Sequence, residues 1–78
     1  MIVNLYAVHD KLAGTFANPF TQNERTAERT FRWMQQEADA KDCEDKEICL
    51  LGNYDNETGE ILSHAPVSVF NLEKEAKE

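Results

Sequence analysis

Two pairs of neighbouring residues carry side chains that could act in acid–base or nucleophilic catalysis. His9 precedes Asp10, and Ser63 precedes His64. Adjacent residues of a strand point to opposite faces, so His9 and Asp10 would not act together on one substrate. The Ser63–His64 pair has no third partner at a suitable spacing. Phosphate-binding loops and nucleophile elbows are absent from the sequence, and we expect a protein that is not an enzyme.

The cysteines and histidines do not have the spacing of a zinc site. Cys43 and Cys49 are six residues apart, outside any CxxC motif, and His9 and His64 form no HxxxH motif. The acidic residues at 44–47 lack the spacing of an EF-hand loop and are typical of a solvated charged segment. We therefore expect no metal and no cofactor. Free thiols are usual in intracellular chains, with a disulfide as the alternative.

One segment has the composition of a nucleic-acid contact surface. Arg25, Arg29 and Arg32 recur at helical spacing, and Trp33 follows them. Guanidinium groups bind phosphates, and an exposed indole can stack on an unpaired base. A second interpretation needs no ligand, because Glu28 can pair with Arg25 and Arg32, while Arg29 can lie over the Trp33 ring. The sequence leaves both interpretations open.

The distribution of charge limits the first interpretation. The chain of 78 residues has a net charge of −7. Residues 1–40 carry four basic and five acidic groups, and residues 41–78 carry four basic and ten acidic groups. An acidic chain is repelled by nucleic acid at long range, so any contact with DNA needs a local basic surface. The three arginines form the one candidate surface.

These arginines are positioned by a helix that the sequence predicts over residues 21–40. Thr21 and Glu24 have the spacing of a capping box, and neither Gly nor Pro interrupts the segment. Apolar residues recur at helical spacing along one stripe, opposite the arginines. They are Ala27, Phe31, Met34 and Ala38.

Short apolar segments on both sides of this helix predict four strands, at residues 2–9, 15–18, 47–54 and 60–64. Ala65-Pro66 is expected to end the fourth strand, and residues 41–46 to form a charged, mobile loop. Residues 67–72 are expected to form either an edge strand or an irregular segment that covers one face of the sheet. The order ββ-α-ββ indicates one α+β domain over residues 1–72, with an antiparallel sheet of about four strands and one helix on one face. Residues 73–78 form a charged tail.

The first strand is apolar on both faces, whereas one helix covers only one face. Ile2, Tyr6 and Val8 share a face that we expect to need cover from residues 67–72 or from a second copy of the chain. A domain of this size buries a small core, which favours the second copy. The sequence therefore predicts a homodimer. It holds no basic leader with an apolar run and no membrane-spanning segment, so we expect a soluble cytoplasmic chain.

Several short motifs, in order along the chain, resemble one known family. The resemblance spans about residues 2–62 and is carried by Asn4-Leu5-Tyr6, Asp10, Ala13-Gly14, Pro19-Phe20, Ala27-x-Arg29-x-Phe31, Leu51-Gly52-x-Tyr54-Asp55 and Thr58-Gly59. The chain resembles the small nonstructural protein of gokushoviruses, which are single-stranded-DNA bacteriophages of the microvirus group.

The resemblance implies a phage protein of the infected bacterial cytoplasm that is absent from the capsid. It implies a role when replication changes from making duplex DNA to making and packaging single strands, with single-stranded DNA or the phage replication complex as partner. It brings no catalytic residue. The residues that would contact DNA are Arg25, Arg29, Arg32 and Trp33. The alternatives are an interaction module that binds a host or phage protein through its acidic half, and a scaffold-like dimer without a ligand.

Overall fold

The computed structural model describes residues 1–73, apart from the side chain of Ala40. Except for Glu73, the expected charged tail lies outside the described residues. The elements are β1 (Ile2–Asp10), β2 (Thr15–Phe16), β3 (Phe20–Gln22), α1 (Glu24–Glu37), α2 (Ala40–Cys43), β4 (Lys46–Asp55) and β5 (Ile61–Asn71).

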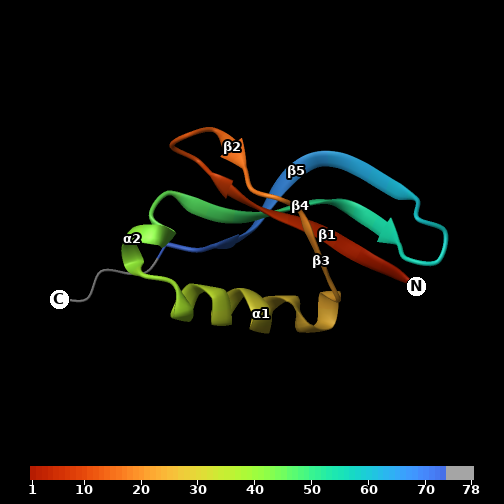
Figure 1. The fold of residues 1–78 in the computed structure, drawn as a ribbon, viewed down its shortest axis with the longest axis horizontal. Helices are drawn as coiled ribbons and strands as arrows, with labels where there is room; N and C mark the ends of the chain where they lie inside the picture. The colour runs from red at the N-terminus through yellow and green to blue at the C-terminus, as the bar shows by residue number, and fades with distance from the viewer. Residues whose placement is uncertain (74–78) are drawn as a thin grey trace.

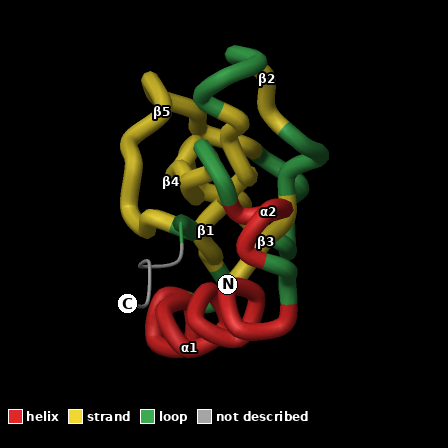
Figure 2. The backbone as a smooth tube through the Cα atoms, turned by 90° about the vertical axis from the view of Figure 1, so that its left-hand side faces the viewer, coloured by secondary structure: helices red, strands yellow, loops and turns green. Residues whose placement is uncertain are grey.

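The five strands form one antiparallel sheet, and α1 lies along one face of it (Figure 1). β2 and β3 pair in turn with the same edge of β1, β1 pairs with β4, and β4 pairs with β5. Figure 2 shows α1 and the sheet as two layers, with the sheet strongly curved above the helix. The prediction of an α+β fold with an antiparallel sheet and one main helix is confirmed.

Phe31 lies at the centre of the core between α1 and the sheet. Its ring centroid is 5.0 Å from that of Tyr6, 6.4 Å from Phe20 and 5.6 Å from Phe70. These partners come from β1, β3 and β5, so a single side chain of α1 contacts three strands. Aromatic pairs in this distance range stabilise a fold beyond the apolar area that they bury.

The helix begins later and ends earlier than the sequence analysis predicts. Asn23 is the N-cap, and its side chain accepts a hydrogen bond of 2.8 Å from the backbone N–H of Arg25. The predicted capping box of Thr21 and Glu24 is wrong, because Thr21 belongs to β3 and pairs with Leu5 of β1. At the other end, the backbone is extended at Ala38.

The prediction of a mobile loop at residues 41–46 is also wrong. This segment holds three of the four residues of α2 and the first residue of β4, and the Cys43 side chain is among the most buried of the core. A thiol packs as a small apolar group, which explains how a segment rich in charge can supply a core residue. Cys43 and Cys49 are both free thiols.

The fourth strand does not end at Ala65-Pro66. β5 continues through Pro66 to Asn71, and its pairing with β4 shifts register between Leu50 and Gly52. Pro66 falls within this irregular stretch, where it has no pairing partner on β4. An edge strand tolerates proline at such a place because no ladder hydrogen bond is lost.

The face assigned to Ile2, Tyr6 and Val8 needs correction. Tyr6 is buried beneath α1 in the core, and Val8 packs against the same cluster. The helix therefore covers the face that the sequence analysis left open, because the bulky Tyr6 ring packs against Phe31. Ile2, the first residue of β1, is 66% exposed. The N-terminal end of β1 extends beyond the end of α1 (Figure 1).

Replacing Gly52 with alanine is expected to force β4 and β5 apart. A Cβ atom at this position would lie 2.1 Å from the backbone oxygen of Leu62 and 2.8 Å from Cα of Ser63. We expect Gly52→Ala to lower the free energy of unfolding, measured in urea, by about 3 kcal/mol. Gly14→Ala is the control: its site is open but has a φ of 71°, and the cost should be about 1 kcal/mol. Equal decreases in the free energy of unfolding of the two variants would contradict the close approach of Gly52 to the backbone of β5.

Candidate nucleic-acid interface

The outer face of α1 carries all four residues that the sequence predicts as a DNA contact. Ala27 and Phe31 are buried against the sheet, whereas Arg25, Arg29 and Trp33 are exposed. This separation follows from the helical period. A residue that is two positions along the chain from a buried one lies on the opposite side of the helix and faces solvent.

Among residues 1–73, Arg32 is the one arginine of this face that has a carboxylate partner. Its Nη2 lies 2.6 Å from Oε1 of Glu28, one turn earlier, and both side chains are well exposed. An exposed pair of this kind contributes only about 0.3–0.5 kcal/mol, so a phosphate could displace Glu28 at small cost. The predicted pairing of Glu28 with Arg32 is thus confirmed.

Arg25 and Arg29 differ from Arg32. Within residues 1–73, neither guanidinium has an ion pair or a contact with an aromatic ring. The interpretation that explains every arginine through internal contacts therefore does not hold for these two. Their charge is directed to solvent.

Trp33 is 60% exposed and borders a shallow hollow on the outer surface of the helix. Arg29, Thr30 and Trp33 line the hollow, which has a volume of about 290 Å³. An exposed indole beside a guanidinium offers one group for stacking and one for a phosphate. The structure thus brings together Arg29 and Trp33.

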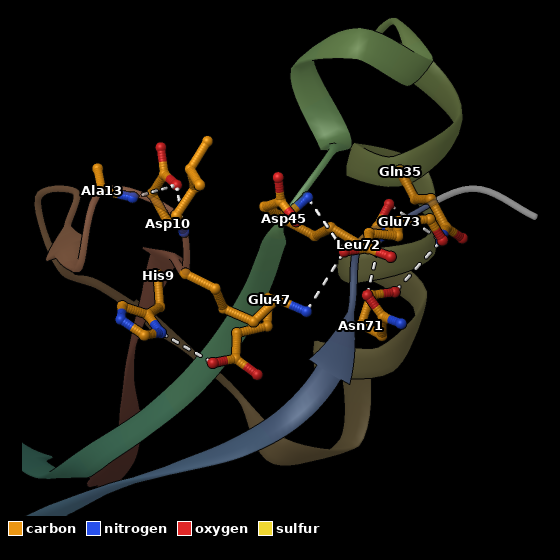
Figure 3. Close-up of polar contacts among 11 residues, drawn as sticks. His9, Asp10, Ala13, Gln35, Asp45, Glu47, Asn71, Leu72 and Glu73 are labelled. Atoms are coloured by element: carbon orange, nitrogen blue, oxygen red, sulfur yellow. Dashed lines mark hydrogen bonds and ion pairs between the residues drawn. The ribbon is translucent and has the colours of Figure 1, made fainter.

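Gln35 fixes the C-terminal half of α1 to the end of β5, a role that the sequence analysis missed. Its Nε2 lies 3.1–3.3 Å from the backbone oxygens of Asn71, Leu72 and Glu73 (Figure 3). These contacts join residues 36 or more positions apart, so periodicity gives no sign of them. They hold the helix at a fixed orientation on the sheet.

A second polar cluster lies on the face of the sheet away from α1. His9 Nδ1 and Glu47 Oε2 are 2.8 Å apart (Figure 3), and the His9 ring stacks on Phe16 at 4.3 Å. The hydrogen bond from His9 lowers the pKa of Glu47 below its ordinary value of 4.5. Burial raises the pKa of the neighbouring Cys49 thiol.

Comparison with known protein families shows a match that covers nearly the whole chain. The family described as Phage ORF5 protein matches residues 3–74. The chain belongs to the Phage ORF5 protein family. It is a small phage protein. No curated protein and no solved structure matches it. Between residues 1 and 73, neither helix of this Phage ORF5 protein has the length and apolar character needed to span a bilayer.

The exposure of Trp33 can be measured directly, because it is the single tryptophan of this Phage ORF5 protein. We expect its fluorescence to have the emission maximum of a water-exposed indole and to be quenched efficiently by acrylamide. A blue-shifted emission that acrylamide does not quench would show that another surface covers the outer face of α1.

Proposed function

We propose that this Phage ORF5 protein is a non-enzymatic accessory protein in the replication or packaging of a single-stranded-DNA phage genome. It acts in the host cytoplasm, where the outer face of α1 binds single-stranded DNA weakly. The resemblance to the gokushovirus nonstructural protein supports the type of genome. The observation that carries the proposal is the pair of guanidiniums of Arg25 and Arg29, which have no partner among residues 1–73 and lie next to an exposed tryptophan.

The spacing of these groups suits a flexible strand. Arg25 and Arg29 lie one turn apart, about 6 Å along the helix axis. Two phosphates of one single strand can meet both guanidiniums, and a base between them can stack on Trp33. A rigid duplex offers no unstacked base to the indole, so the arrangement favours single strands.

The binding is expected to be weak and dependent on salt. Two phosphate contacts correspond to a slope of about −1.4 in a plot of log K against log salt for single strands. The net charge of −7 opposes the approach of DNA at long range. A homodimer that presents two copies of α1 to the same strand would double the number of contacts.

β5 is the surface that we propose for this homodimer. It forms one edge of the sheet, and its side chains Ile61, Leu62, Val67 and Val69 are 45–61% exposed. The eleven residues of this strand include no Asp, Glu, Lys or Arg. Two copies can therefore meet along β5 without bringing carboxylates together, and a long apolar edge strand is prone to pair with another.

Analytical ultracentrifugation tests the dimer. We expect a mass near twice the 8.9 kDa of the chain. The double variant Val67→Lys/Val69→Lys should sediment as a monomer, because it places like charges on both copies of the edge. Leu12→Lys, at an 84% exposed site outside β5, is the control and should remain dimeric. A wild-type chain that sediments as a monomer would contradict the proposal.

A gel-shift assay with a single-stranded oligonucleotide at about 50 mM salt tests the DNA contact, since electrostatic binding is strong at low salt. Arg25→Gln/Arg29→Gln should weaken binding about tenfold or more, because each charge-assisted contact contributes on the order of 1 kcal/mol. The control Lys11→Gln/Lys41→Gln removes the same charge away from α1 and should bind nearly as the wild type does.

Two results would overturn the DNA contact. If the wild type gives no shift at low salt, an acidic module that binds a host or phage protein remains as the alternative. If both double variants weaken binding equally, overall charge rather than the face of α1 determines binding.

A further inference from the structure

We propose that His9, Glu47 and Cys49 form a binding site for a Zn²⁺ ion on the face of the sheet opposite α1. Their ligand atoms, an imidazole nitrogen, a carboxylate oxygen and a thiol sulfur, all lie within 4.8 Å of one another. These three residues come from two neighbouring strands and belong neither to the core beneath α1 nor to the proposed DNA contact.

The register of β1 and β4 creates this cluster. His9 lies directly opposite Glu47, and Cys49 follows Glu47 by two residues, so all three side chains emerge on the same face. Val8 and Ile48, which neighbour them along the strands, instead pack into the core. The alternation of the strands thus separates the polar cluster from the apolar core.

The ligand set is one that zinc uses. Zn²⁺ binds imidazole nitrogen and carboxylate oxygen at about 2.0–2.2 Å and thiolate sulfur at about 2.3 Å. Tetrahedral geometry with these bonds requires ligand atoms about 3.3–3.8 Å apart. The distance of 2.8 Å between His9 Nδ1 and Glu47 Oε2 is shorter than this range. No two ligand atoms of the cluster are more than 4.8 Å apart, about 1 Å beyond its upper end. Small side-chain movements therefore suffice to hold the ion.

Burial and charge also fit a dication. Cys49 is only 3% exposed, whereas the side chains of His9 and Glu47 are 22% and 19% exposed. The ion would be held in a partly dry site but could reach it from solvent, with the fourth position left for water. On binding, a Zn–S bond replaces the Cys49 S–H bond and the proton passes to water. The thiolate and the Glu47 carboxylate then balance the charge of the ion.

Contacts around the ligands hold two of them in place. Phe16 of β2 stacks on the His9 ring with an interplanar angle of 20°, which fixes the plane of the imidazole. Ser68 of β5 pairs with Cys49 in the sheet and helps to lower the pKa of the Glu47 carboxyl. Supporting contacts of this kind are typical of metal ligands. An ion here would link β1 to β4 and stabilise a domain whose core is small.

Spacing along the sequence could not find this site. The rules for zinc motifs apply to ligands within one turn or loop. His9 and Glu47 are 38 residues apart, and only the pairing of β1 with β4 brings them together. Spacing rules of this kind do not apply to a site that forms between two strands.

Metal titration of the chelator-treated full chain tests the site, with Zn²⁺ for affinity and Co²⁺ as the spectroscopic probe. We expect one equivalent to bind, with a thiolate-to-cobalt charge-transfer band and an increase in Tm on adding Zn²⁺. Cys49→Ser should lose the band and the increase in Tm. His9→Gln should weaken binding about tenfold or more.

The second cysteine supplies a matched control. Cys43 is buried in the core on the α1 side, so Cys43→Ala should keep both the band and the increase in Tm. Circular dichroism checks that each variant folds, and His9→Gln, at a partly exposed position, serves if a cysteine variant does not. The proposal is overturned if the folded wild type binds no Co²⁺ or Zn²⁺, or if Cys49→Ser or His9→Gln binds both metals as the wild type does.

Discussion

The packing of Phe31 among aromatic rings from three strands is the interaction on which the rest of the structure depends. Tyr6, Phe20 and Phe70 surround it from β1, β3 and β5, so the attachment of α1 to the sheet is concentrated at one side chain. Because Phe31 must face the sheet, the helical period directs Arg25 and Arg29 to solvent. The cationic surface is thus a consequence of how the core is packed.

The parts of the fold that the sequence predicts correctly are those with a strong local pattern. The stripe of Ala27 and Phe31 recurs at helical spacing, and both residues are buried in the structure. The first strand and the two hairpins are marked by apolar segments and by the turns between them. The exposed arginines follow from the same period, so most of the candidate interface was also predictable.

The remaining features depend on contacts between distant residues. Thr21 fits a helix cap by spacing, but its pairing with β1 places it in a strand. Cys43 lies in a charged segment, yet the core has room for its thiol. Pro66 is tolerated because the pairing of β5 with β4 is irregular at that point. Local preference gives way to tertiary contacts at each of these positions.

The outer face of α1, held outward by Phe31, is the surface through which we propose that this phage protein contacts single-stranded DNA. The most direct measurement is a titration of the ¹⁵N-labelled chain with a short single-stranded oligonucleotide, followed by amide chemical shifts at low salt. We expect the largest shifts at residues 25–33 and at the Trp33 indole N–H. Shifts that cluster on the sheet with α1 unchanged, or no shifts at all, would contradict the proposed contact.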